Sequence, residues 1–262
     1  MDSCSCVDLS MIEDLPPDTW QDLQSRVARI FNEIGLTADV DKKLTTPRGE
    51  VEIDVYAIDH GSVDQIRYIV ECKNWKNPVS QNIVHAFTTV MHESGGNIGF
   101  IVSARGFQKG ATGYTKNTNI ICLSYDDFQL RYLDVWLRRY FAPEVGKAFD
   151  SFVQYVEPIN CRRDRLVAEL PQIAKEQFNN LSERYALFGI GIASLIFPCY
   201  LLKEESMRTK NLPAIKDMLS KLLGDEPMFH SLSFRAMQTE LIKFAGKATS
   251  QFNELFGRDI FK

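Results

Sequence analysis

The chain has 262 residues, of which 45% are hydrophobic and 24% are charged, and its formal net charge is −4. This composition is typical of a folded globular protein and excludes a largely disordered chain. A net negative charge also argues against a protein that binds nucleic acid over its whole surface. At this length the chain can form one large domain or two smaller ones.

The charge is distributed unevenly along the chain. Residues 1–64 carry 14 acidic and five basic side chains, whereas residues 65–116 carry two acidic and six basic ones. Because clustered lysine and arginine attract the phosphate backbone, the middle segment is the predicted contact region if the protein binds nucleic acid. A solvated basic surface without a ligand is the equally weighted alternative.

The cysteines are interpreted as free thiols. The six are spread without a C-x-x-C pair, and Cys72 and Cys122 fall in apolar segments, where a thiol packs as a small hydrophobic group. Cys4 and Cys6 lie close together but lack the partners of a zinc site. We therefore expect a reducing, cytoplasmic environment. The N-terminus also lacks the basic and apolar pattern of a secretory signal.

The chain is expected to begin with a flexible lead-in over residues 1–17. A helix follows from Asp18 or Thr19, either of which can cap it, to about Ile34. Its apolar residues recur every three or four positions, which predicts one buried face. A strand over about residues 37–44 comes next.

Two short segments then show the alternation of β-strands and carry side chains of opposite charge. The first, residues 48–56, carries Asp54, and the second ends on Glu71, Cys72 and Lys73. Positions two apart in a strand share a face, so Glu71 and Lys73 point one way and Cys72 the other. The polar turn between the segments predicts a hairpin, which would bring Asp54 close to Glu71.

This arrangement points to metal-assisted attack on a phosphodiester. Two carboxylates beside a backbone carbonyl are hard oxygen ligands of the kind that Mg²⁺ or Mn²⁺ prefers. A lysine at the rim can orient the attacking water. On strand pattern alone, an exposed hairpin with scattered charges and one Glu71–Lys73 pair is the alternative, because exposed strand faces are often charged.

Asp54 followed by Glu71–Cys72–Lys73 resembles the D…(D/E)-x-K motif of the restriction-endonuclease-like (PD-(D/E)xK) nucleases. Within them it is similar to the Mrr-like branch, whose second strand reads ECK or QCK. The resemblance covers roughly residues 18–135. The other segments that carry it are 20–36 at the opening helix, and 99–111 and 120–123 in the later strands and the helix between them.

The resemblance implies a nuclease domain over residues 18–140, with the α/β fold of a mixed sheet flanked by helices. It also implies Mg²⁺-dependent, or Mn²⁺-dependent, hydrolysis of DNA. In that reading Asp54 and Glu71 bind the metal, the Cys72 carbonyl supplies a further oxygen, and Lys73 stabilises charge on the phosphate. Such nucleases often act as homodimers or larger oligomers in defence against foreign DNA.

One position departs from the family pattern. Gln24 stands where the Mrr-like opening helix carries a glutamate, so it would supply an amide but no charge. We include Gln24 in the predicted catalytic set as an auxiliary residue. Glu52, on the same strand face as Asp54, could add a third carboxylate, and Glu33 is a weaker substitute near the helix end.

Five residues are predicted to contact nucleic acid. Pro78 is expected to open a second helix with Gln81 in its first turn, although a solvent-exposed glutamine is the alternative. His85 and His92 have no third ligand and are interpreted as surface or core histidines. The predicted nucleic-acid-binding residues are Arg48, Lys76, Gln81, Arg105 and Lys109.

Beyond Pro143 the strand signals vanish, and residues 141–262 are predicted to be an all-α domain. The expected helices are roughly 144–156, 163–182, 184–203, 213–223 and 233–256. Residues 186–202 form an uncharged run near the lower length limit of a membrane span. Its two glycines and its proline weaken that interpretation, so a buried core helix is favoured.

The leading interpretation is therefore a metal-dependent endodeoxyribonuclease in restriction or anti-phage defence, with no small-molecule cofactor. A nuclease fold without activity that binds nucleic acid or protein is the first alternative, and Gln24 favours it slightly. The second is a nuclease tethered to a membrane through residues 186–202. Within the enzyme class, RNA or branched DNA are open as substrates.

Overall fold

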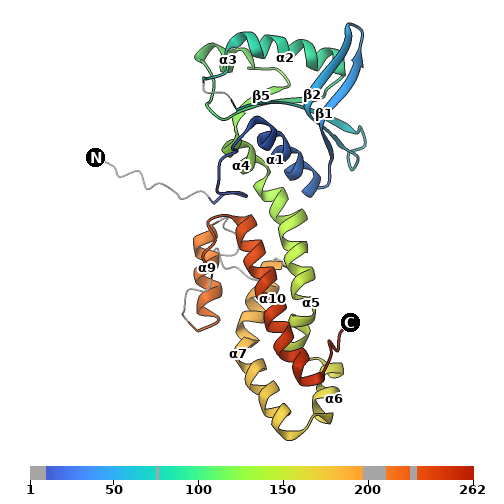
Figure 1. Ribbon diagram of the computed structural model, residues 1–262, viewed down its shortest axis with the longest axis vertical. Helices are drawn as coiled ribbons and strands as arrows, with labels where there is room; N and C mark the ends of the chain where they lie inside the picture. The colour runs from blue at the N-terminus through green and yellow to red at the C-terminus, as the bar shows by residue number, and fades with distance from the viewer. Residues whose placement is uncertain (1–9, 75–76, 197–210, 225–228) are drawn as a thin grey trace, which may run out of the picture. The chain divides into compact units, whose positions relative to one another are not determined.

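The computed structural model describes residues 10–74, 77–196, 211–224 and 229–262, which form two compact units (Figure 1). The first unit is Asp14–Tyr140. The second combines residues 10–13 with Phe141–Lys262. Each unit has its own core and is described by itself.

A five-stranded mixed sheet forms the centre of the first unit. Its strands lie in chain order, with β1 antiparallel to β2, β2 antiparallel to β3, and β3, β4 and β5 parallel. The α/β fold class predicted from the sequence is thereby confirmed. The strands are β1 (Thr37–Thr46), β2 (Gly49–Asp59), β3 (Ile66–Lys73), β4 (Ile98–Ser103) and β5 (Ile120–Ser124).

Helices cover both faces of this sheet (Figure 1). On one face α1 (Trp20–Glu33) packs beside α4 (Tyr125–Trp136), and on the other lie α2 (Gln81–Ser94) and α3 (Lys109–Tyr114). The layer of α2 and α3 follows from the parallel half of the sheet, because each helix lies in a crossover between parallel strands, whereas α1 and α4 precede and follow the sheet in the chain.

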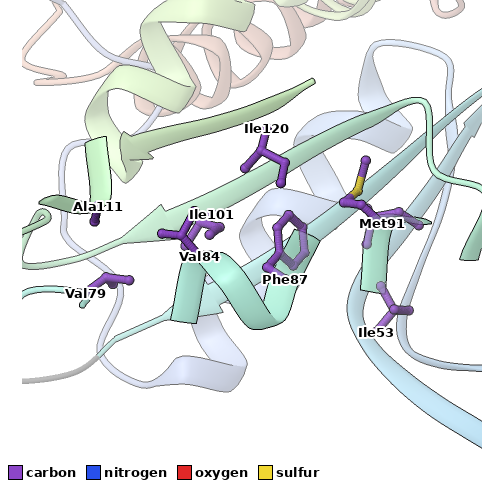
Figure 2. Packing of buried hydrophobic residues seen from close by; sticks show 9 residues of the cluster. Ile53, Val79, Val84, Phe87, Met91, Ile101, Ala111 and Ile120 are labelled. Carbon is purple, nitrogen blue, oxygen red and sulfur yellow. The ribbon is translucent and has the colours of Figure 1, made fainter. Parts of the chain in front are cut away.

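The α2 face is held by a cluster of aliphatic and aromatic side chains (Figure 2). Four strands each contribute an isoleucine, and these pack against Phe87 and Met91 of α2. The opposite face is mainly aromatic: the ring of Phe31 in α1 lies 5.5 Å from Tyr68 and 5.3 Å from Phe128, centroid to centroid. The four isoleucines are Ile53, Ile69, Ile101 and Ile120.

The helix start predicted at Pro78 is wrong. The helix begins at Gln81, because Val79 pairs with Phe107 as a short parallel bridge before it. The Val79 amide donates to the Gly106 carbonyl at 3.0 Å, so this backbone is extended rather than helical.

The second unit is all-α, as predicted for residues 141–262. Its core is aromatic: Phe149, Phe152 and Phe188 are fully buried and in ring contact. After a π-helical turn, η1 (Leu137–Phe141), the helices are α5 (Ala142–Val156), α6 (Cys161–Glu169), α7 (Gln172–Ile196), α9 (Leu212–Lys221) and α10 (Phe234–Phe256).

The helix boundaries differ from the prediction between residues 161 and 196. The chain was expected to break near residue 183, but it breaks at Leu170–Pro171 and α7 then runs without interruption to Ile196. No helix within the described ranges is long and apolar enough to cross a membrane. Residues 197–202 of the uncharged run lie outside those ranges.

The lead-in predicted to be flexible over residues 1–17 is partly built into the second unit. Ile12 is fully buried, and the amides of Phe234 and Arg235 donate to the carbonyls of Met11 and Ile12 at 3.0 Å each. Residues 10–13 thus bind the first turn of α10, where helical amides lack intrahelical partners. Residues 1–9 lie outside the described ranges.

Candidate active site

Asp54 lies at a break in β2. The β1–β2 register pairs Val40 with Val55 and Lys42 with Ile53 but leaves Asp41 and Asp54 unpaired between them. Asp41 has a φ of 50°, a left-handed conformation that aspartate tolerates better than most residues. The result is a local departure from regular strand geometry at the residue that carries the predicted carboxylate.

The side-chain pattern of β2 shows the same break. Ile53 and Tyr56 both pack against the α2-face cluster although they are three residues apart. In a regular strand, residues three apart point to opposite faces. The strand therefore turns about its axis around Asp54.

A hydrogen bond fixes the Asp54 carboxylate against β3. The β2–β3 ladder ends at the pair Val55–Val70, and beyond it the Cys72 amide donates to Asp54 Oδ2 at 2.7 Å. Backbone groups of one strand residue point to the same side, so the Cys72 carbonyl also faces β2. The next carbonyl, of Lys73, points to the β4 side and accepts from the Ala104 amide at 3.0 Å.

Glu71 and Lys73 form an ion pair on the face of β3 opposite Cys72. Lys73 Nζ contacts Glu71 Oε1, and the two side chains are 16% and 26% exposed respectively. Burial raises the pKa of Glu71 above its ordinary value, the nearby Asp54 charge raises it further, and Lys73 opposes both effects. Two carboxylates and an ammonium therefore meet in one half-buried place.

The Cys72 side chain has no part in this group. Its thiol is buried on the α1 side of β3, and burial raises its pKa well above the ordinary value, with Asp54 and Glu71 adding to the effect. A thiol held protonated in this way is a poor metal ligand and a poor nucleophile. The Cys72 carbonyl therefore stays the predicted oxygen donor of this residue.

Neither suggested extra carboxylate joins the pair. Across the described ranges, no three His, Cys, Asp or Glu side chains converge, so Glu52 does not complete a group with Asp54 and Glu71. Glu33 accepts a hydrogen bond from Trp136 Nε1 at 2.6 Å. It therefore has a structural role at the far end of α1.

Gln24 lies on the buried face of α1, with 2% of its surface exposed. The Phe31 ring contacts Tyr68, and Gln24 comes seven residues before Phe31. Seven helical residues rise about 10 Å, the length of about three strand residues, which places Gln24 level with Glu71. The Asn74 side chain reaches the Pro17 carbonyl at 3.3 Å, consistent with this antiparallel alignment.

The side-chain amide of Gln24 is unsatisfied. Its Nε2 has no hydrogen-bond partner among the described residues, although such a group is costly to bury unpaired. Gln24 comes from the α1 side of the sheet, the side of Cys72, whereas Glu71 and Lys73 lie on the other face of β3. Its buried donor fits a place for a water molecule on the α1 side.

The described residues predicted to contact nucleic acid lie on different elements of the first unit. Arg48 is highly exposed, but its guanidinium pairs with Glu93 at 2.8 Å. The Gln81 amide is within 3.2 Å of His85 Nε2. Arg105 and Lys109 are exposed in the turn after β4 and at the start of α3. Lys76 lies outside the described residues.

Ser103 shapes the site but was not predicted. It ends β4, is 1% exposed and is paired in register with Lys73. Its hydroxyl donates to the Gly106 carbonyl at 3.0 Å and accepts from the Arg105 amide at 3.2 Å. The sequence signal was the S-x-x-G turn, in which Gly106 supplies a φ of 73°.

Comparison with known proteins gives a family match for part of the first unit. Residues 18–130 match the family model Mrr_cat, described as restriction endonuclease. No curated protein sequence matches the chain. A solved structure described as "Protein of Unknown Function AF1548" is 16% identical, with a TM-score of 0.37 over 78% of this chain and 95% of that one. Residues 18–130 thus carry the sequence pattern of the restriction endonuclease family that the Mrr_cat model describes.

Proposed function

We propose that this protein is a divalent-metal-dependent endonuclease that hydrolyses phosphodiester bonds in DNA. The observation that carries the proposal is the convergence of Asp54, Glu71 and Lys73 at the end of β3. The family match over residues 18–130 supports nuclease chemistry, and the metal, the substrate and the site residues are our inference.

The donor set fits Mg²⁺ or Mn²⁺. Asp54 and Glu71 offer carboxylate oxygens and Cys72 a carbonyl that faces the same side, and these hard donors suit small divalent cations. Burial and, after it, repulsion from the Asp54 carboxylate raise the pKa of Glu71, and a bound cation would relieve that repulsion. When bound, the cation would supply Lewis-acid stabilisation of charge on the phosphate oxygens.

The remaining roles belong to the side chains around this pair. Lys73 holds a positive charge within contact of Glu71, where it can stabilise charge that develops on the scissile phosphate. Gln24 has a buried amide donor on the α1 side of the sheet, where it can hold a water molecule, and we assign it only an auxiliary role. Arg105 and Lys109 are exposed cations available to the DNA backbone.

The wider biological role rests on analogy with the family. We infer restriction or anti-phage defence, with residues 141–262 providing target choice or oligomerisation and residues 14–140 the chemistry. Cys72, Cys122 and Cys161 are free thiols, which supports a reducing compartment such as the cytoplasm.

The test is cleavage of plasmid DNA by the full chain with Mg²⁺ or Mn²⁺. We expect Lys73→Ala to lower the rate by about 100-fold or more, the usual effect of removing one electrostatic stabiliser. Lys43→Ala, an exposed lysine on β1, is the matched control and keeps the parent rate. Equal rates for Lys73→Ala and the parent would refute the catalytic assignment.

A non-catalytic nuclease-fold binding module is the second candidate. Two observations favour it: the neutral Gln24 and the lack of a third converging carboxylate within the described residues. It predicts that the parent binds DNA but yields no cleavage with either cation. Cleavage that Asp54→Asn abolishes would exclude it.

A further inference from the structure

The surface that begins at the candidate site is almost without acidic residues. The 54 residues from Cys72 to Tyr125 contain one, Glu93, whereas the whole chain has 34 in 262. Glu93 is itself paired with Arg48 at 2.8 Å. The α2 and α3 helices belong to this segment and lie side by side (Figure 1). They therefore present no uncompensated negative charge to a polyanion.

Two aromatic rings are in tilted contact on this surface. His85 of α2 and Tyr114 of α3 have ring centroids 3.9 Å apart with an interplanar angle of 37°. His85 is exposed and Tyr114 is half-buried, so the histidine forms the outer layer of the pair. We refer to His85 and Tyr114 together as the aromatic pair.

Neighbouring residues hold the aromatic pair in place. Gln81 Nε2 is 3.2 Å from His85 Nε2, which fixes the imidazole on the helix surface. Gln81 can take this position because Gly110 lies beneath it: a Cβ at residue 110 would come within 2.9 Å of Gln81 Oε1. A fixed ring loses little conformational freedom when a ligand stacks on it.

A short path of backbone contacts joins the aromatic pair to the candidate site. The Lys73 carbonyl bonds the Ala104 amide, and two residues later the Gly106 carbonyl bonds the Val79 amide, two residues before Gln81. Two residues span at most about 7 Å, and a DNA strand advances about 3.4 Å per nucleotide. A strand bound at Glu71 and Lys73 can therefore reach His85 within a few nucleotides.

We propose that the aromatic pair stacks on an unpaired nucleobase of the substrate, a few nucleotides from the cleaved bond. The phosphates between that base and the cleaved bond are bound by two cations, Arg105 in the turn along that path and Lys109 at the start of α3. In a duplex the base faces are already stacked on one another, so an exposed ring serves only unpaired or splayed nucleotides. The substrate class is thus DNA with a single-stranded segment beside the scissile phosphodiester. This inference rests on the proposed function.

The test measures binding by the full chain in EDTA, so that hydrolysis does not enter. Fluorescence anisotropy is recorded with a labelled single strand, a duplex with a single-stranded overhang and a blunt duplex. We expect His85→Ala to weaken binding of the first two DNAs about five- to a hundredfold, the range for one stacked base. Binding of the blunt duplex is unchanged.

Two further variants separate stacking from other effects. His85→Phe keeps a ring but loses the contact with Gln81, and it retains parental affinity if stacking is the basis. His92→Ala removes an exposed histidine seven residues along the same helix and binds as the parent does. A 2-aminopurine base in the overhang reports stacking directly: its fluorescence changes on binding the parent and His92→Ala but not His85→Ala.

The outcomes distinguish this inference from the proposed function. Parental affinity of His85→Ala for overhang DNA, or equal affinity of the parent for blunt and overhang DNA, overturns the stacking site even if the protein cleaves DNA. Conversely, binding that depends on His85 without any metal-dependent cleavage supports the stacking site and overturns only the catalytic proposal.

Discussion

At the scale of single residues, Glu71 carries its charge where the fold disfavours it. Burial and the Asp54 carboxylate raise its pKa, and the ion pair with Lys73 offsets this only in part. The folded protein therefore binds the Glu71 proton more tightly than the unfolded chain does. As the pH rises from the ordinary glutamate pKa of about 4.3 through the raised pKa of the folded state, the folded protein releases the Glu71 proton at a cost. The free energy of unfolding therefore falls over this pH range.

Glu71→Gln is accordingly expected to stabilise the protein in EDTA at neutral pH, because it removes the disfavoured charge. The gain, within about 1 kcal/mol, shrinks as the pH falls toward the ordinary carboxyl pKa, where Glu71 is protonated in both states. Urea denaturation of both proteins across this pH range measures the effect. A variant that is less stable than its parent in EDTA at every pH would contradict the predicted sign.

Added Mn²⁺ should reverse this order. A cation that binds only the folded state, at a free concentration 100 times its dissociation constant, adds about 2.7 kcal/mol to the free energy of unfolding. Glu71→Gln lacks one ligand of this cation and gains less. Glu50→Gln, at an exposed position of β2, is the matched control and follows the parent with and without the cation. Equal stabilisation of parent and Glu71→Gln by Mn²⁺ would show that Glu71 is not a ligand.

The sequence predicted which side chains meet but not how Asp54 is held. The two-residue period of strands and the hairpin turn were enough to bring Asp54 toward Glu71. The bond from the Cys72 amide occurs beside the break at Asp41, where φ is 50°. Aspartate occurs in many conformations, so its presence in a strand does not mark such a break.

At the scale of elements, the caps of α1 and α2 differ although both positions carry a hydroxyl. Thr19 Oγ1 accepts the Asp22 amide at 3.1 Å, whereas Ser80 makes no side-chain bond to α2. We expect Thr19→Ala to lower the free energy of unfolding by about 1 kcal/mol. Ser80→Ala is the matched control and changes it by less than about 0.5 kcal/mol. Thermal unfolding measures both, and equal losses would contradict this assignment.

Helix boundaries in the second unit show why local patterns misled. Pro171 excludes the α conformation for the residue before it, and Leu170 is extended with a ψ of 152°. The apolar spacing of residues 163–182 continues across Pro171 and therefore does not reveal this helix end. Near residue 183 the sequence has neither glycine nor proline, and α7 continues.

At the scale of the whole molecule, fold class was predictable and the membership of residues 10–13 was not. Strand and helix periods are local, so a mixed α/β half and an α-helical half were both evident. The burial of Ile12 depends on α9 and α10, some 200 residues later: Ser10 Oγ accepts the Leu212 amide at 2.9 Å. Four residues without a helical or strand period give no such signal.

The chain thus passes between the units twice, after Glu13 and at Tyr140–Phe141. Because Ile12 is fully buried, Ile12→Ala should lower the stability of the second unit by about 2–5 kcal/mol. The tryptophans allow the units to be followed separately, since Trp20, Trp75 and Trp136 all fall within the sequence of the first unit. Far-UV circular dichroism follows mainly the second unit, which has more helical residues.

We expect Ile12→Ala to shift the circular dichroism transition in urea to lower concentration and to leave the tryptophan transition in place. Leu15→Ala, three residues later and 67% exposed, is the matched control and shifts neither. An unshifted dichroism transition for Ile12→Ala would mean that residues 10–13 add nothing to the second unit. A shift confined to tryptophan fluorescence would assign residues 10–13 to the first unit instead.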